Sequence, residues 1–374
     1  MKRKQFICML ALVACSALQA QTNFRELTFA QALQAAAQEG KMVMIDCYTS
    51  WCGPCKMMAA KEFPKKEMGD YLNPKFVCMK MDMEKGEGPD MSKRYDVSCF
   101  PTFLFLDSKG ELLFRMSGSM DTETFKQKTE AGLANTETGI AAMMKRYKNG
   151  ERSEAFVKEY IDELRANMMQ GEISKVVSEY LKGKTAADLA ANQEYFDMFC
   201  NCIDQLDDPL FQTMYADKEV LIAKYGKKAD DKFYNVLKNH PFHFATFDGK
   251  KLTSYDFNKL DEYVAKLKSE KVKEAEQIGA YYRYYVAFLE KNTDEAYKQA
   301  KIFSKYDIRD YWIYYSMLSE LENAGKDVEP MAKKCIKALE KQKKALDSTD
   351  EKAIKRIDRQ INQMNDLIAS PKKD

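Results

Sequence analysis

The stretch WCGPCK, residues 51–56, decides the fold of the first part of this chain. It follows a short apolar run at residues 41–48 (KMVMIDCY), which is typical of a buried β-strand, and a helical pattern comes directly after it. Two cysteines three residues apart at a helix start can form a disulfide without unwinding the helix. The free backbone N–H groups and the dipole of that helix stabilise a thiolate on the first cysteine. The motif therefore predicts a redox-active dithiol, with Cys52 as the nucleophile and Cys55 as the resolving thiol.

Helical and strand patterns alternate around this motif, from about residue 27 to residue 133. Thr28 is a suitable N-cap for one helix, and Gly40 a suitable C-terminal stop. The predicted elements are helix 28–39, strand 41–48, a helix after Cys55 that is interrupted at Pro64, strand 76–83, a hairpin of strands 102–106 and 111–116, and a helix from Asp121 to about 133. This order predicts an α/β domain of about a hundred residues, which we place at residues 21–136.

This part of the sequence resembles the thioredoxin family. WCGPCK stands as it does in thioredoxins, Asp46 precedes Cys52 by six residues, and Lys80 falls in the next predicted strand. Residues 100–102 (Phe-Pro-Thr) match the family's cis-proline turn. The longer run of residues 27–133 is also similar to the soluble thioredoxin-like domain of DsbD-type electron carriers. The resemblance implies a thioredoxin fold, with a central mixed sheet and flanking helices, and thiol–disulfide oxidoreductase activity without a metal or other cofactor.

The resemblance also implies roles for individual residues. In the family a buried aspartate at the position of Asp46 takes the proton from the resolving cysteine, and a lysine at the position of Lys80 pairs with it. The catalytic residues are then expected to be Cys52, Cys55, Asp46, Lys80 and Pro101, and the substrate-binding residues Trp51, Gly53, Pro54, Phe100 and Thr102. Two departures from the family pattern, Cys47 beside Asp46 and the bulky Phe100 before the proline, are expected to alter substrate choice.

Several of these signals have a second interpretation. Asp46 could be a structural acid whose charge Lys80 neutralises, with no catalytic role. Cys99 could be either a regulatory or dimer-forming thiol or a small half-buried residue without a redox role. The CxxC pair could be half of a zinc site, but a second CxxC is absent and the only histidines, His240 and His243, are distant in sequence. The alternating methionines at residues 79–83 allow a copper(I) site, although alternation is equally typical of a half-buried strand.

The hydrophobic pattern of the sequence changes after residue 135. Strand-like runs disappear, apolar residues recur with i, i+3, i+4 spacing, and glycines separate the segments. The pattern predicts an irregular array of helical hairpins, similar to tetratricopeptide repeats, over residues 137–374. The helices expected in it are 153–169, 193–206, 253–268, 273–290, 293–305, 308–323 and 328–345.

Residues 1–20 (MKRKQFICMLALVACSALQA) predict an export signal, because a basic start precedes an apolar run that is too short to span a bilayer. Cleavage after Ala20 would release the mature chain. Alternatively, residues 12–15 resemble a lipobox, which would leave Cys15 lipidated and the protein anchored to a membrane. Both interpretations place the protein in the periplasm.

The charge balance of the chain excludes some classes of binding partner. The 374 residues carry 59 lysines and arginines against 57 aspartates and glutamates, so no excess of positive charge favours nucleic acid or an anionic membrane surface. We therefore predict an exported oxidoreductase that reduces disulfide-containing proteins, is recharged by a membrane-embedded thiol carrier, and recruits partners through its helical part. The alternative is a helical protein-binding scaffold that carries a redox-sensing thioredoxin module.

Overall fold

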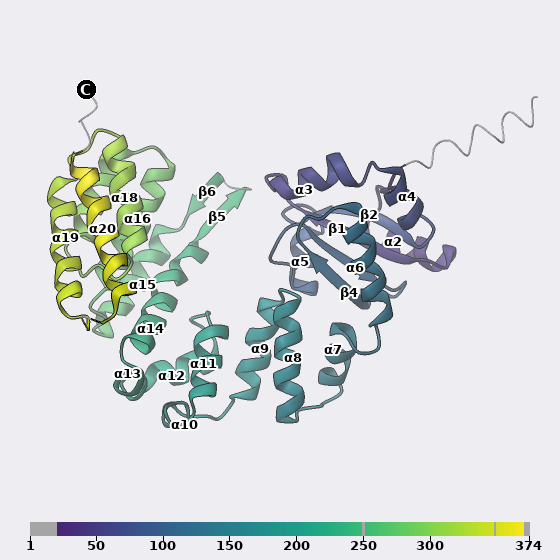
Figure 1. Ribbon diagram of the computed structural model, residues 1–374, viewed down its shortest axis with the longest axis horizontal. Coiled ribbons are helices and arrows are strands. Elements are labelled where there is room, and N and C mark those ends of the chain that lie inside the picture. The colour runs from purple at the N-terminus through teal and green to yellow at the C-terminus, as the bar shows by residue number, and fades with distance from the viewer. Residues whose placement is uncertain (1–20, 249–250, 348, 370–374) are drawn as a thin grey trace, which may run out of the picture. The chain divides into compact units, whose positions relative to one another are not determined.

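The computed structural model describes residues 21–369, apart from 249–250 and 348 (Figure 1). The chain divides into two compact units, which meet in sequence between Tyr225 and Gly226. Among the described residues, the first unit holds a four-stranded sheet with the helices up to α13, and the second holds α14 to α20. The expected export signal lies outside the described residues, as does the tail from Ser370.

The sheet of the first unit confirms the predicted α/β fold. Its strands run in the order β2-β1-β3-β4, with β1 parallel to β2 and the other pairs antiparallel. Each strand falls within a predicted segment or extends it by one residue: β1 is Met42–Tyr48, β2 Phe76–Asp82, β3 Thr102–Leu106 and β4 Leu112–Ser117. The register of the parallel pair places Asp46 of β1 beside Lys80 of β2.

Six helical segments accompany the sheet: α2 (Phe29–Glu39), α3 (Gly53–Met57), the π-helical η1 (Met58–Glu62), α4 (Lys66–Leu72), α5 (Gly88–Tyr95) and α6 (Thr122–Ala134). Thr28 caps α2 through a capping box with Gln31, and Gly40 ends it in the left-handed conformation, as predicted. The sequence analysis missed α5, because Gly88-Pro89 resembles a turn. Gly88 is required there, since a Cβ atom would lie 2.0 Å from the carbonyl oxygen of Asp82.

Two hydrophobic clusters cover the two faces of the sheet. One joins α2 and α5 to alternate residues of the strands and includes Met79, Met81 and Met83, so these methionines are core side chains. The other joins the opposite face to α4 and α6 and includes Met44, Met58 and six buried phenylalanines. Asp46 follows Met44 by two residues on β1, and therefore faces this second cluster.

The first unit continues beyond the sheet domain with seven helices: α7 (Ile140–Lys148), α8 (Glu154–Ala166), α9 (Gln170–Tyr180), α10 (Ala186–Ala191), α11 (Gln193–Cys202), α12 (Pro209–Ala216) and α13 (Lys218–Tyr225). Helix α7 packs against β4, and neighbouring helices such as α8 and α9 contact each other along the chain (Figure 1). The domain boundary between residues 136 and 137 stays a prediction. These helices group with the sheet, because their contacts join them to the first unit.

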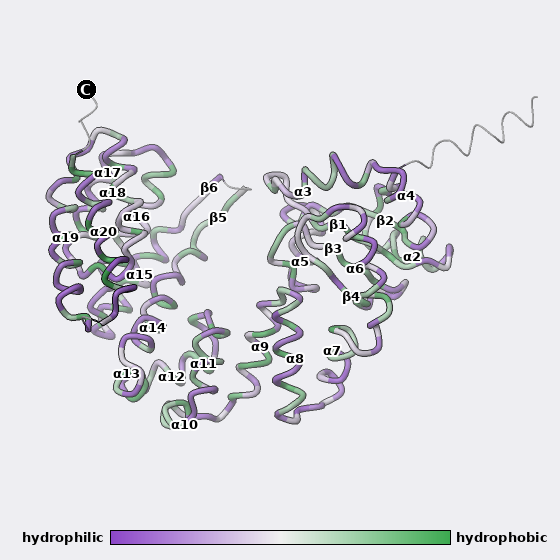
Figure 2. The backbone as a smooth tube through the Cα atoms, viewed as in Figure 1, coloured by the Kyte–Doolittle hydropathy of each residue, from purple (hydrophilic) through white to green (hydrophobic). Residues whose placement is uncertain are grey.

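The second unit is helical apart from one hairpin. Its helices are α14 (Lys227–Asn239), the 3-10 segment η2 (His240–Phe244), α15 (Phe257–Ser269), α16 (Ala275–Leu289), α17 (Thr293–Phe303), α18 (Tyr311–Asn323), α19 (Glu329–Lys344) and α20 (Glu351–Ala369). Figure 2 shows hydrophilic and hydrophobic residues alternating along them, as one-sided burial requires.

The hairpin consists of β5 (Ala245–Asp248) and β6 (Lys251–Tyr255), which pair antiparallel. It corrects one expectation, because the helix expected from residue 253 begins only at Phe257. Strands this short carry too few alternating residues to be distinguished from the start of an amphipathic helix. Among the described residues, no helix combines the length and the apolar character that a membrane span needs.

Candidate active site

Cys52 and Cys55 lie at the start of α3, after the loop that follows β1. They form a disulfide, with their Cα atoms 5.3 Å apart. Cys52 is the N-cap of α3, and the backbone N–H of Cys55 donates a hydrogen bond to its Sγ atom (3.1 Å). After reduction the same N–H group points at a thiolate on Cys52, where the positive end of the helix also favours negative charge. Pro54 occupies the first helical turn, where its missing N–H costs nothing.

The Phe100–Pro101 peptide bond is cis, as the resemblance implied, and its turn leads into β3. The ring of Trp51 meets Phe100 edge to face, with the centroids 6.2 Å apart. The indole N–H of Trp51 also donates to Glu84 (2.9 Å), a contact that the sequence analysis did not foresee. Trp51 is 40% exposed, so its ring offers an apolar surface beside the disulfide.

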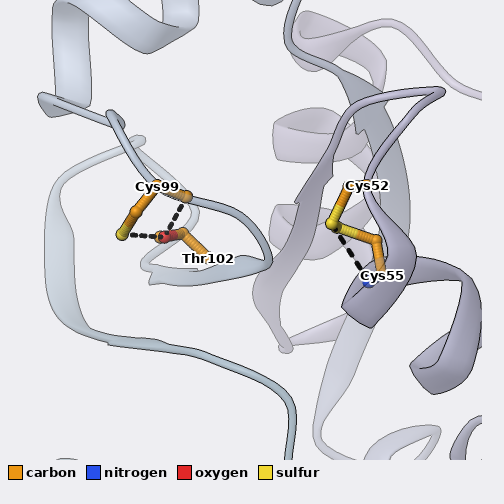
Figure 3. Close-up of a disulfide and its surroundings, with 4 residues drawn as sticks. All are labelled: Cys52, Cys55, Cys99 and Thr102. Carbon is orange, nitrogen blue, oxygen red and sulfur yellow. Dashed lines mark hydrogen bonds between the residues drawn. A yellow bond between two sulfur atoms is a disulfide. The ribbon is translucent and has the colours of Figure 1, made fainter. Parts of the chain in front are cut away.

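Figure 3 shows Thr102 and Cys99 together in the turn segment, apart from the disulfide. The hydroxyl of Thr102 donates to the carbonyl oxygen of Cys99 (2.8 Å), and it lies 2.8 Å from the hydroxyl of Ser117. Because the Thr102 side chain is fully buried, a substrate contact at this residue would have to come from its backbone.

Asp46 lies on β1, six residues before Cys52, and its side chain is almost completely buried. Its neighbour in the sheet, Met44, shares a core cluster with Met58, which follows Cys55 by one helical turn. Burial raises the pKa of Asp46 from its ordinary value of 3.8 to about 7, while the positive charge of Lys80 acts in the opposite direction. The Oδ1 atom of Asp46 has no hydrogen-bond partner. The site therefore holds an acid that titrates near neutral pH.

Lys80 differs from the expectation in one detail. Its Cα atom is the register neighbour of Asp46, but its ammonium group lies over the rings of Phe24 (4.5 Å) and Phe63 (5.5 Å). All three residues line an open pocket of about 640 Å³ formed with the segment that precedes α2. Lys80 thus acts on Asp46 through its charge at a distance. Phe24 could not be predicted as part of this site, because a single aromatic residue outside any periodic pattern does not indicate its packing partners.

The comparisons with known proteins agree with this geometry. Residues 29–133 match the family model of a thioredoxin-like domain. Thioredoxin of Pongo abelii is 35% identical over 103 residues, which are 28% of this chain and 85% of that protein.

The chain belongs to the thioredoxin family.

Two further relatives complete the comparison. The thiol:disulfide interchange protein DsbD of Pseudoalteromonas atlantica is 32% identical over 101 residues, which are 26% of this chain and 17% of that protein. A solved structure from Bacteroides thetaiotaomicron, whose name proposes a disulphide isomerase, is 43% identical; it covers 30% of this chain and 94% of its own, with a TM-score of 0.29. The chain spans only 61% of the length of Thioredoxin-1 from Drosophila melanogaster. All these matches concern the thioredoxin domain.

In this thioredoxin-family protein, Cys47, Cys78, Cys99 and Cys335 are free thiols. Burial raises the pKa of the Cys47 thiol, and it raises the pKa values of Cys78 and Cys335 to about 12, so these three are unreactive near neutral pH. Within the described part of the chain, no group of three or more His, Cys, Asp or Glu side chains could hold a metal ion.

Proposed function

We propose that this protein is an exported thiol–disulfide oxidoreductase that reduces disulfides in periplasmic proteins. One observation carries the proposal: the strand that leads to the CxxC disulfide at the helix start holds a buried carboxyl group, Asp46, whose pKa is about 7. A dithiol alone would also suit a structural disulfide. A buried base that titrates near neutral pH, on the strand that leads to the dithiol, suits repeated proton transfer.

The reaction follows from the roles of three groups. The Cys52 thiolate attacks one sulfur of the substrate disulfide, a new S–S bond forms, and the other substrate sulfur leaves as a thiolate. Asp46 then takes the proton of Cys55, and the Cys55 thiolate attacks Cys52. The second substrate thiol leaves, and the enzyme ends as the Cys52–Cys55 disulfide. Two electrons pass from the enzyme dithiol to the substrate.

The substrate would lie against the turn at Phe100 and Pro101, where the resemblance places it, with the exposed ring of Trp51 beside it. Gly53 supports this arrangement, because it adds no side chain next to Cys52 and a Cβ atom at this position would meet nothing within 4 Å. The space in front of the disulfide is therefore open to a polypeptide.

The protein would be exported and would receive its electrons from a partner. Residues 1–20 have the pattern of an export signal, either cleaved after Ala20 or lipidated at Cys15. An exported reductase needs an external source of electrons, and a membrane-embedded thiol carrier would supply them. The similarity of 101 residues of this chain to part of a thiol:disulfide interchange protein supports this kind of partner. The Gly-Pro pair between the cysteines resembles that of reducing thioredoxins, which favours reduction over oxidation.

The equilibrium of the dithiol against a glutathione redox buffer tests the direction. We expect a reduction potential close to the thioredoxin value of about −270 mV, together with reduction of insulin by the dithiothreitol-reduced protein. A potential near that of the oxidant DsbA, about −120 mV, would contradict the proposed reductase. The Cys52→Ser variant is the control that shows whether insulin reduction depends on this site.

A further inference from the structure

The turn between α8 and α9, residues 167–169, lies beside the segment that leads into the cis-proline turn. The hydroxyl oxygen of Ser98 is 3.5 Å from the carbonyl oxygen of Met168. Ser98 precedes Phe100 by two residues, and Phe100 contacts Trp51. The surface around the disulfide thus continues from Trp51 through Phe100 and Ser98 to Met168, and crosses from the thioredoxin domain onto the added helices.

A partly buried hydrogen-bonded joint holds this turn in place. The carboxylate of Asp96, at the end of α5, accepts a hydrogen bond from the backbone N–H of Glu172 (2.9 Å) in the first turn of α9. Gly171 allows the close approach, because a Cβ atom there would lie 2.9 Å from Asp96 Oδ1. On the other side, the buried guanidinium of Arg115 donates to the carbonyl oxygens of Tyr95 (2.6 Å) and Asp96 (3.1 Å). The start of α9 is therefore tied to β4 and α5.

Met168 has an unusual backbone conformation for its residue type. The N–H of Met168 bonds to Arg165 O, and that of Met169 bonds to Leu164 O, so α8 ends in a Schellman motif with Met168 at its left-handed position (φ 57°). Glycine is the usual residue there, because a side chain strains this conformation. Among the described non-glycine residues with positive φ, the other three are Asp96, Lys271 and Lys291, all polar. An apolar residue in this position needs a reason other than helix termination.

The side chain of Met168 also faces solvent. It is 54% exposed, more than any other large hydrophobic side chain described in the first unit, whereas its neighbour Met169 is buried. The two adjoining segments, residues 97–106 and 166–171, contain no charged residue in a chain that is 31% charged. The path from Phe100 through Ser98 to Met168 is thus uncharged and partly apolar, which favours an extended polypeptide with uncharged, apolar side chains.

We propose that Met168 is a specificity-determining residue, which contacts an apolar side chain of the polypeptide substrate a few residues away from its reacting cysteine. The proposal rests on the proposed function, because the substrate must be held at Pro101 for its chain to reach the α8–α9 turn. The flexible thioether suits a contact with varied apolar partners. The helices added after the thioredoxin domain then take part in substrate choice directly, through this one turn.

The test uses the full-length protein, reduced and freed of reductant, in single turnovers. The probes are peptides of about a dozen residues, a length that extends well beyond the reacting cysteine. Each has one cysteine joined as a mixed disulfide to 2-nitro-5-thiobenzoate (TNB) and carries either leucines or serines on both sides. The Cys52 thiolate attacks the peptide sulfur and the coloured thiobenzoate leaves; Cys55 then displaces the peptide thiol. The symmetrical disulfide DTNB serves as the small probe without a peptide chain.

Two variants probe Met168. Met168→Lys keeps the side-chain length and has a precedent in this chain, since Lys271 and Lys291 adopt the same backbone conformation. Met168→Gly removes the side chain and relieves the backbone, so it should fold at least as well as the native protein. Val220→Lys is the matched control, because Val220 is an exposed apolar residue of α13 at 43% exposure.

We expect both Met168 variants to lower the second-order rate constant for the leucine peptide about three- to tenfold, as the loss of one apolar contact does. The constants for the serine peptide and for DTNB should stay at the native value, as should all constants of Val220→Lys. The inference is wrong if the leucine peptide reacts equally fast with both Met168 variants, or if DTNB slows by the same factor. Failure of the native protein to reduce DTNB would instead overturn the proposed function.

Discussion

Asp46 in the first unit and Arg309 in the second are both ionisable groups that folding removes from water, but their surroundings differ. The guanidinium of Arg309 forms ion pairs with Asp230 (2.8 Å) and Glu274 (2.7 Å) and lies over the ring of Tyr234. Asp46 is more deeply buried, has an oxygen without a hydrogen-bond partner, and meets its nearest cation only at a distance.

The difference distinguishes Arg309, whose charge has a structural role, from Asp46, which is suited to proton transfer. Carboxylates raise the pKa of Arg309, so its charge persists and links α14 to the loop before α18. Nothing neutralises Asp46 in this way, and burial moves its pKa to about 7. A buried carboxyl group without a neutralising partner lowers the stability of the fold, but it is suited to proton transfer. The predictions below test this contrast.

The largest effect is expected for Cys55→Ser. The variant can form the mixed disulfide at Cys52 but cannot resolve it, so insulin turnover should fall about a thousandfold while the mixed disulfide accumulates. Cys335→Ala, which changes a buried thiol of the second unit, should leave turnover unchanged. Intact-mass analysis of the trapped complex provides the measurement. Continued turnover in Cys55→Ser would assign the resolving role to another thiol.

Asp46→Asn should slow the resolving step about a hundredfold at pH 7, because an amide cannot accept the proton of Cys55. Formation of the mixed disulfide depends on Cys52 and should change little. Stopped-flow measurement of both steps, with TNB and then peptide release, separates them. Equal slowing of the two steps would mean that the substitution had damaged the site as a whole.

At pH 8, substitutions of Asp46 and of Glu274, the partner of Arg309, should change the free energy of unfolding with opposite signs. Between pH 4 and pH 7 the native state keeps a proton on Asp46 that the unfolded state has released, so the native protein loses stability as pH rises through this window. The loss approaches about 4 kcal/mol above pH 7, and burial of the Asn amide offsets about half of it. Asp46→Asn should therefore be about 2 kcal/mol more stable at pH 8 than the native protein, with no gain at pH 4.

Glu274→Gln, by contrast, removes one partner of Arg309 and should cost about 1 kcal/mol at pH 8. Urea unfolding at both pH values, followed for each unit separately, checks the two signs. If Asp46→Asn is destabilising at pH 8, Asp46 is not the buried acid described above.

The smallest effect is expected for Lys80→Met. Removing the positive charge removes the influence of Lys80 that lowers the pKa of Asp46, so the pH midpoint of the resolving step should rise, by about one unit or less. Phe24→Leu, which removes one ring beneath the ammonium group, should shift the midpoint by less. A fall of the midpoint in Lys80→Met would show that Lys80 acts on Asp46 by another route.

The sequence predicted the site well where its signal was local. The CxxC motif, the aspartate six residues before it and the Phe-Pro-Thr turn lie in short segments with fixed spacing, and these segments predicted the strands, their burial and the position of the disulfide. The ring contacts of Lys80 could not be predicted, because Phe24 reaches β2 only through an isolated bridge to Cys78. No pattern in the sequence specifies such a pairing.

The helical part was predicted less completely for a related reason. The helices expected at residues 273–290 and 328–345 correspond to α16 and α19. The amphipathic helices α14 and α20 were not among those expected. Neither were α10, α12 and α13, which offer only six to eight residues each. The joint between Asp96 and α9 connects residues 76 positions apart, and only the folded chain brings them together. The placement of Met168 beside the cis-proline segment follows from that joint.

The central claim is that Cys52 is the nucleophile of a dithiol activated by its position at the start of α3. Brief treatment of the reduced native protein with iodoacetamide at pH 7, followed by mass mapping of the labelled cysteines, tests it most directly. The account predicts that Cys52 is labelled first, because its thiolate is stabilised by the N–H of Cys55 and by the helix dipole. If Cys55 is labelled before Cys52, the assignment of the two roles is wrong.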